Sequence, residues 1–146
     1  MIKTFRGVLA DGGQERIRLS TNTGLVGYKI LKFEILPHNP GDVQQESIVQ
    51  LFRQEVGTVP TTAGEINFES PLLMAAVVGF YGAVASNNSQ SQTVIFDSEI
   101  VNQDIYVTHT DNASNQKINY YVEMEQVKLD LNEATVATLK NMRGRE

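Results

Sequence analysis

The sequence predicts an all-β fold, an antiparallel β-sandwich of the jelly-roll type with at most one or two short helices. Turn sequences rich in Gly, Asn, Asp and Pro recur about every dozen to two dozen residues. Short runs that alternate apolar and polar residues lie between these turns. Asn, Gln, Ser and Thr supply 40 of the 146 residues while charged residues make up only 20%, a balance typical of strands and turns rather than helices.

The turns divide the chain into segments of strand length. Their sequences are DGG, NTG, PHNPGD, PTTAGE, SNNSQSQ and DNASNQK, at residues 11–13, 22–24, 37–42, 60–65, 86–92 and 111–117. Frequent short strands joined by polar loops are typical of sandwiches and barrels. A chain of 146 residues suits one hydrophobic core, so we expect a single β-sandwich domain over residues 1–146.

Alternation identifies the individual strands. In QERIRLS, Ile17 and Leu19 share one face of the predicted strand, and in LKFEIL one face carries Leu31, Phe33 and Ile35. Successive side chains of a strand point to opposite faces. We therefore expect both runs to be half-buried strands with these five residues facing the core.

Residues 70–81 combine helix and strand signals. Ser70 is suited to cap a helix, and Pro71 to occupy its first position. The β-branched Val77 and Val78 that follow favour a strand. We expect a helical turn that leads into a strand.

Residues 104–130, DIYVTHTDNASNQKINYYVEMEQVKLD, predict a long hairpin around a polar loop. In its first strand Ile105, Val107 and His109 share one face, so His109 continues an apolar row close to the loop. We interpret His109 as a hydrogen-bonded residue at the end of a strand rather than as a catalyst.

The second strand of this hairpin changes its alternation. Apolar residues occupy even positions up to Met124 and odd positions from Val127 onward. A shift of one residue turns every later side chain to the other face of the sheet. We therefore predict a β-bulge, or a passage to the other sheet, at Glu125 or Gln126.

Residues 132–143 predict a short helix or an extended arm. Val136, Leu139 and Met142 recur at spacings of three, and Asn132 is suited to cap the start. The β-branched residues of the same segment oppose a helix, so the arm is the alternative.

The overall charge and the cysteine count exclude several classes of protein. The net charge is −5, and the 12 Lys and Arg residues are scattered, so nucleic acid is not an expected partner. There is no Cys, which excludes disulfides and thiolate metal sites. Residues 1–13 lack the apolar core of a signal peptide, and the apolar stretch at 71–85 is too short to span a bilayer. We expect no membrane partner.

The two histidines lack partners for catalysis or metal binding. His38 lies between two prolines in LPHNPGD, a rigid turn, and His109 has no partner at a catalytic spacing. Without Cys or an H-x-x-x-H motif, a transition-metal site would need carboxylates from scattered loops. The sequence contains neither a G-x-S-x-G motif nor a P-loop. We therefore expect no enzyme activity, no cofactor and no metal.

Acidic residues cluster at Asp97, Glu99 and Asp104. Loop carboxylates and carbonyls together can bind calcium, but this spacing matches no known calcium loop, so we expect solvated turn acids. Paired carboxylates hydrolyse glycosidic bonds when they converge in a cleft. These three acids are the only support for a small hydrolase.

Three stretches together carry a resemblance that covers almost the whole chain: DGGQERIRLSTNTGLVGYKILKFEILP, FDSEIVNQDIYVTHTDN and NYYVEMEQVKLDLNEATVATLKNMRGRE. They resemble small virion structural proteins of marine tailed bacteriophages, including cyanophages and related podoviruses. The resemblance is one of overall pattern and contains no catalytic signature, so it assigns no active residue.

The resemblance implies a head decoration, or cement, protein. Such a protein binds the outside of the capsid as a homo-oligomer, with a trimer favoured, and stabilises the shell. The implied partner is the major capsid protein of the same virion, on particles assembled in the cytoplasm of a bacterial host. The alternative is a receptor- or glycan-binding module associated with a tail or fibre, because such modules are also β-rich.

A cement protein gains affinity when several modest contacts act together. The mildly basic ends, residues 1–7 and 132–146, are expected to act as docking arms. Adjacent aromatic residues in a strand direct one side chain outward, where Tyr is suited to an interface. The predicted oligomer or capsid contacts are Ile2, Phe5, Arg6, Tyr81, Tyr121, Leu139, Met142 and Arg143.

Overall fold

The computed structural model describes residues 1–21, 23–40, 44–81, 90–96 and 100–143, without the side chains of 90 and 141–143. In this part of the chain eight strands and one helix follow each other, which confirms the predicted all-β class. The elements are β1 (Ile2–Leu9), β2 (Gln14–Ile17), β3 (Val26–Pro37), β4 (Gln45–Phe52), β5 (Leu73–Tyr81), β6 (Gln90–Ile95), β7 (Ile105–Asp111), β8 (Ile118–Lys128) and α1 (Leu131–Arg143).

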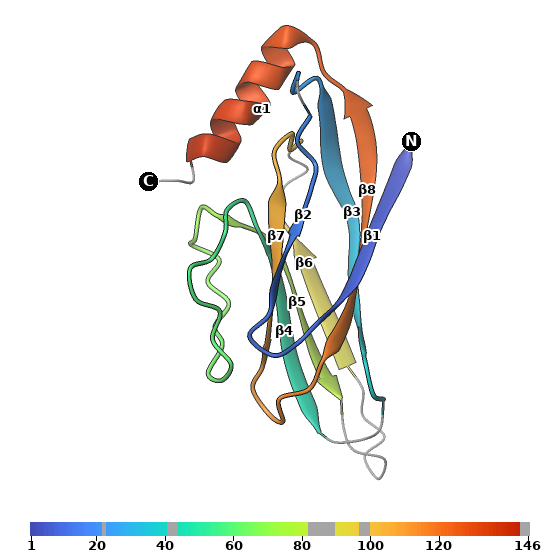
Figure 1. Cartoon of the computed structure of the whole chain (residues 1–146), viewed down its shortest axis with the longest axis vertical. Coiled ribbons are helices and arrows are strands. Elements are labelled where there is room, and N and C mark those ends of the chain that lie inside the picture. The colour runs from blue at the N-terminus through green and yellow to red at the C-terminus, as the bar shows by residue number, and fades with distance from the viewer. Residues whose placement is uncertain (22, 41–43, 82–89, 97–99, 144–146) are drawn as a thin grey trace.

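The strands form two antiparallel sheets, one with the order β1-β8-β3 and one with the order β2-β7-β4-β5-β6. β8 lies between β1 and β3 while β7 lies between β2 and β4, so the β7–β8 hairpin crosses from one sheet to the other. This nesting is the strand order of a jelly roll. β6 pairs with β5 and also approaches β3, where the Thr93 hydroxyl donates to the Phe33 carbonyl at 3.1 Å. Figure 1 shows the two sheets and α1 at the end of the sandwich where β8 ends.

The main core lies between the two sheets. Ile17 and Leu19 are buried as predicted, and so are Phe33 and Ile35. Leu31, which was expected on the same face, is 41% exposed. The pairing of β3 with β8 shifts between Ile30 and Lys32, so Leu31 is the extra residue of a β-bulge and is turned away from its predicted face.

The bulge predicted at Glu125 or Gln126 is wrong in position. β8 stays in one sheet and pairs with β3 without a shift from Glu125 to Lys128. The irregularity lies in the neighbouring β3 instead. The apolar residues change parity because Val127 and Leu129 pack in a second cluster, together with Ala134 and other residues near α1. The change thus marks a second packing partner and not a slip of register.

The turn expected at Ser70, leading into a strand, is present, but it is a single tight turn and not a helical one. The Ser70 hydroxyl accepts the N–H of Leu72 at 3.3 Å, and the Ser70 carbonyl accepts the N–H of Leu73 at 3.4 Å. Ser70 therefore closes a tight turn, and β5 begins directly at Leu73. The capping signal at Ser70 thus gives one turn only, because β5 pairs with strands on both sides directly after it.

The C-terminal helix is confirmed, but its cap is Asp130 and not Asn132. The Asp130 carboxylate accepts the N–H of Glu133 at 2.7 Å, and the Glu133 carboxylate accepts the N–H of Asp130 at 3.4 Å. This reciprocal pair is a capping box. The hydroxyl of Thr135 donates to the carbonyl of Leu131, which accommodates a β-branched residue inside the helix.

Asn102 attaches α1 to the sandwich. Its side chain is fully buried, and its Nδ2 atom donates to the Gly24 carbonyl at 3.1 Å, the Ala134 carbonyl at 3.2 Å and the Thr138 hydroxyl at 2.8 Å. Ala134 and Ala137 of α1 are buried against Leu129. The helix is thus packed onto the protein through both hydrogen bonds and apolar contacts.

Candidate docking surface

The outer face of the three-stranded sheet is the surface on which most of the predicted contacts of β1 and β8 come together. The register aligns Arg6 of β1 with Tyr121 of β8, and Tyr121 with Glu34 of β3. We call this surface the β1–β8–β3 face. It consists of Ile2, Thr4, Arg6, Val8, Asn119, Tyr121, Glu123, Glu125, Lys32, Glu34 and Leu36.

The β1–β8–β3 face mixes apolar and charged side chains, and each of them is exposed or half-buried. Ile2 is 52% exposed, Val8 46% and Leu36 68%. Lys32 and Glu34 form an ion pair with Nζ and Oε1 3.4 Å apart, and an exposed pair of this kind adds little stability. The face therefore offers a central Tyr and Arg, flanked by apolar residues, to a partner.

Phe5 lies on the other side of the same strand. Its ring meets that of Tyr28 edge to face, with centroids 6.4 Å apart and planes at 73°. Both side chains are partly buried against the main core. Phe5 is therefore placed at the inner side of the sheet edge and does not belong to the β1–β8–β3 face.

The N-terminal segment expected as an arm is part of the sheet. Residues 2–9 form β1, which pairs with β8 along its whole length. Docking through this segment would use the outer edge or face of a strand. At the other end, residues 131–143 form α1.

Tyr81 is half-buried at the end of β5, and its ring packs directly over Gly79. Burial raises the pKa of its hydroxyl, which has no hydrogen-bond partner among the residues that the structure describes. The neighbouring Phe80 is the exposed member of the pair, at 47%. The structure thus places Tyr81 apart from the other predicted contact residues.

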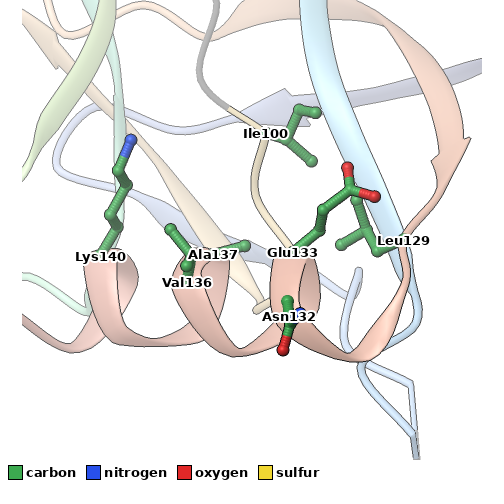
Figure 2. A pocket seen from close by; sticks show the side chains of 7 residues that line it. All are labelled: Ile100, Leu129, Asn132, Glu133, Val136, Ala137 and Lys140. Atoms are coloured by element: carbon green, nitrogen blue, oxygen red, sulfur yellow. The ribbon is translucent and has the colours of Figure 1, made fainter.

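Leu139 lies on the exposed surface of α1, 53% exposed, near a groove of about 580 Å³ between the helix and the sandwich. Figure 2 shows Ile100 and Leu129 facing the helix across this groove. Its lining residues are Ile100, Leu129, Asn132, Glu133, Val136, Ala137 and Lys140. Met142 and Arg143 continue α1, but their side chains lie outside the described residues.

Sequence reasoning missed an aromatic patch beside β5 and β6. Phe68 is 56% exposed, and its ring meets that of Phe96 edge to face at 4.7 Å. A shallow groove of about 320 Å³ lies next to Phe68, lined also by Val78 and Val94. β5 is a continuous apolar run, and such runs do not reveal which face of a strand is outside.

A buried polar cluster contains the only described Ser–His contact. The Ser47 hydroxyl lies 3.0 Å from His109 Nε2, and His109 Nδ1 lies 3.1 Å from the Ala10 carbonyl oxygen. A carbonyl oxygen can only accept, so Nδ1 carries the ring proton and Nε2 accepts the Ser47 hydroxyl. Gln45 Nε2 donates to the Ser47 oxygen at 2.7 Å.

The Ser47–His109 contact has the order of atoms found in a nucleophile and its base, but its surroundings fit a structural role. Ser47 and His109 are both 0% exposed, so a substrate cannot reach the hydroxyl. Burial lowers the pKa of His109, although the Ala10 carbonyl and the Asp11 carboxylate oppose the shift. The neutral ring thus joins β7 to β4 and to the turn after β1, in agreement with its interpretation as a hydrogen-bonded strand-end residue.

Of the three acids considered for calcium, only Asp104 lies in the described part of the chain; Asp97 and Glu99 lie outside it. Asp104 accepts the N–H groups of Leu19 and Ser20 and the Ser20 hydroxyl, each at 2.9 Å. These bonds lower the pKa of Asp104, although burial acts in the opposite direction. Asp104 is therefore occupied in holding the strand end after β2.

Within the described ranges, His, Asp and Glu side chains do not gather in threes as a metal site would require. No helix in the same ranges is long and apolar enough to cross a membrane. We found neither a protein family nor a curated protein that matches the chain.

Proposed function

We propose that this chain is a structural protein of a phage virion, a decoration or cement protein that binds the outside of the head and stabilises the shell. The observation that carries the proposal is the β1–β8–β3 face, where Ile2, Arg6 and Tyr121 lie together on a hydrogen-bonded sheet. Tyr and Arg are enriched at the centres of protein interfaces. The jelly-roll order of the strands and the resemblance of the whole chain agree with this role.

The partner in this proposal is the major capsid protein of the same virion. A rigid sheet face loses little conformational freedom on docking, which favours affinity. The contact of a single copy is limited by the size of a three-stranded sheet, so several linked copies would strengthen attachment through avidity. The protein would act as a homo-oligomer on the capsid surface, after assembly in the cytoplasm of a bacterial host.

The number of copies in purified virions tests this proposal. Quantitative mass spectrometry of particles from the encoding phage should find hundreds of copies, and electron cryomicroscopy should place them on the head. A few copies per particle, or density at the tail, would contradict a role in decoration. This measurement does not depend on any mutation.

A binding assay tests the face itself. Shells from particles that lack the protein should bind the recombinant chain, and Tyr121→Ala should weaken this binding about tenfold or more, the loss expected for a central interface residue. Tyr106→Ala is a matched control, because Tyr106 is also a half-buried Tyr but belongs to β7 of the other sheet. Equal effects of the two variants would show that the β1–β8–β3 face is not the docking site.

The exposed aromatic patch favours a second candidate, a tail- or fibre-associated module that binds a receptor or glycan. Phe68 and Phe80 offer large apolar surfaces outside the core, and patches of this kind mark binding sites. A glycan array and host-cell binding by the purified chain should then give a signal that Phe68→Ala removes. Binding to shells without any glycan signal would reject this candidate.

A further inference from the structure

β1 is an edge strand with an unused side. Within the described residues it pairs with β8 alone, over the eight residues Ile2–Leu9, and it contains no Pro. Figure 1 shows β1 diverging from β2 beyond the turn that joins them, so the edge is not covered by β2. An open edge of this length is a template for another strand.

The register of β1 and β8 shows which residues of β1 direct their backbone hydrogen-bonding groups to this open edge. The N–H of Gln126 donates to the Met1 carbonyl at 2.8 Å, which makes Met1 and Gln126 a hydrogen-bonded pair that continues the β1–β8 register. Hydrogen-bonded and non-hydrogen-bonded pairs alternate along an antiparallel ladder. The odd residues of β1 therefore bond to β8. The even residues, Ile2, Thr4, Arg6 and Val8, direct their N–H and C=O groups to the open edge.

We propose that a second copy of this chain pairs with this edge, antiparallel and β1 to β1, about a twofold axis at Phe5. In this register Ile2 lies opposite Val8 of the second copy and Thr4 lies opposite Arg6 of the second copy. These are hydrogen-bonded pairs, as the direction of the even residues requires. The two three-stranded sheets then form one continuous six-stranded sheet.

The side chains of β1 fit this register. Ile2 and Val8 are both about half exposed and stand near opposite ends of the strand, so the twofold axis brings each against the other and covers both. Arg6 meets the uncharged Thr4. On the inner side Phe5, now half-buried, meets Phe5 of the second copy and extends the core across the axis.

Charge complementarity supports the same register. Lys3 falls opposite Gly7 of the second copy, which has no side chain to oppose it. The Glu15 Oε2 atom lies 3.1 Å from the position that a Cβ on Gly7 would take, and Glu15 makes no ion pair within the described ranges. Lys3 of one copy can therefore reach the Glu15 carboxylate of the other, once on each side of the axis.

The neighbouring registers fit less well. Moving the axis to Arg6 would place the two Arg6 side chains opposite each other, and like charges directly opposite destabilise a sheet. Moving it to Thr4 would leave Val8 without a partner strand and would separate Lys3 from Glu15. A shift by a single residue would pair even with odd positions and lose the hydrogen bonds.

This contact is independent of the proposed function, since the dimer would form whether the chain binds a capsid or a receptor. It also differs from the threefold assembly that the resemblance implies. An antiparallel edge contact is isologous and closes with two copies. The species in solution should have twice the 16.2 kDa mass of one chain.

Sedimentation equilibrium and light scattering over a range of concentrations test the stoichiometry. We expect a monomer–dimer equilibrium. Thr4→Pro should weaken it about tenfold or more, because Pro removes an N–H that faces the open edge and leaves the β1–β8 ladder intact. Thr4→Val, which keeps this N–H, is the matched control and should still dimerise. A chain that is monomeric or trimeric at every concentration would overturn the proposal.

Cross-linking through single cysteines tests the register directly. The natural chain has no Cys, so a single Phe5→Cys gives one thiol per copy. Opposite residues of a non-hydrogen-bonded pair have Cα atoms about 4.5 Å apart, within disulfide range. We expect mild oxidation to give a covalent dimer. Lys3→Cys is the control, because the two Lys3 positions are about 13 Å apart in this register. Efficient cross-linking at Lys3 and none at Phe5 would overturn it.

A charge exchange tests the Lys3–Glu15 contact. Lys3→Glu should weaken dimerisation about tenfold, since it sets two carboxylates against each other, and the added Glu15→Lys substitution should restore it. Lys140→Glu on α1 makes the same charge change away from β1 and should leave the equilibrium unchanged. Circular dichroism reports whether each variant is folded. A folded Lys3→Glu/Glu15→Lys protein that dimerises no better than Lys3→Glu would show that this contact is absent.

Discussion

Gly7 occupies the point where β1 passes closest to the ring of Tyr120. A Cβ at Gly7 would lie 2.8 Å from Cε2 and 3.0 Å from the hydroxyl oxygen of Tyr120, which is 3% exposed. Because the ring is packed in the core, it cannot move aside at low cost. We expect Gly7→Ala to lower the free energy of unfolding by about 1–3 kcal/mol, as measured by urea denaturation.

Gly57 offers the matched control for this substitution. A Cβ at Gly57 would meet no atom within 4 Å. Gly57→Ala should therefore leave the free energy of unfolding unchanged within about 0.5 kcal/mol, or raise it slightly by restricting the unfolded chain. If both variants lose the same stability, the contact with Tyr120 does not limit the size of residue 7.

Single residues of the candidate surface could be predicted only where one face of a strand is solvated. β8 alternates clearly, so Tyr121 points outward as expected and meets Arg6 through the register. Residues 1–7 were expected as an arm, and the mixed pattern of β1 did not reveal that Arg6 and Phe5 lie on opposite faces of a strand. β5 is paired on both sides in the sheet and reads as an apolar run. The choice between Phe80 and Tyr81 therefore depended on tertiary packing, which exposes Phe80.

Among the elements, α1 is held by apolar contacts and by the hydrogen bonds of one buried side chain, Asn102. Asn102 Nδ2 gives hydrogen bonds to Gly24, Ala134 and Thr138 and lies in the core. Asn102→Ala should leave the Gly24 carbonyl without its donor, while the Ala134 carbonyl keeps the Thr138 hydroxyl, and should lower the free energy of unfolding by about 1–3 kcal/mol. Hydrogen exchange should then become faster in α1 than in the strands, because the capped helix loses its attachment rather than its own hydrogen bonds.

Asn119→Ala is the control for the effect on α1. Asn119 also donates from Nδ2, but only to the Pro37 carbonyl at 3.3 Å, and it is half-buried in β8. Its replacement should leave exchange in α1 unchanged. A uniform increase of exchange in Asn102→Ala would instead mean that Asn102 stabilises the whole fold and does not specifically hold the helix.

The elements themselves were largely predictable because their signals are local. The capping pattern and apolar spacing identified the helix, although the cap is Asp130 and not the predicted Asn132. The change of alternation after Met124 also marked a real feature, since Val127 and Leu129 pack in the second cluster. The bulge at Leu31 was missed because no turn residue marks it in the sequence. β3 pairs with β8 on both sides of the bulge.

The arrangement of the whole molecule could be predicted only as a class. Turn spacing and alternation indicate a sandwich, but the order of strands depends on pairs far apart in the chain, such as β1 with β8 and β2 with β7. The buried polar cluster has the same origin. Ser47 and His109 belong to strands that are adjacent in the sheet but separated in sequence, and no spacing rule connects them.

His109 makes the stability of the whole sandwich depend on pH. Burial lowers its pKa below the ordinary value of about 6.5, so between the two values the unfolded chain binds more protons than the folded one. The free energy of unfolding should therefore be highest above about pH 6.5 and should fall on acidification, by at most about 1.4 kcal/mol per pH unit for this proton. Burial raises the pKa of Asp11, which acts with the opposite sign but at lower pH. Urea denaturation between about pH 8 and pH 5.5 measures the slope, and His109→Gln should reduce it while His38→Gln, at an exposed turn, should not. A slope that survives in His109→Gln would mean that the acid sensitivity does not arise from the buried ring that joins β7 to β4 and to the turn after β1.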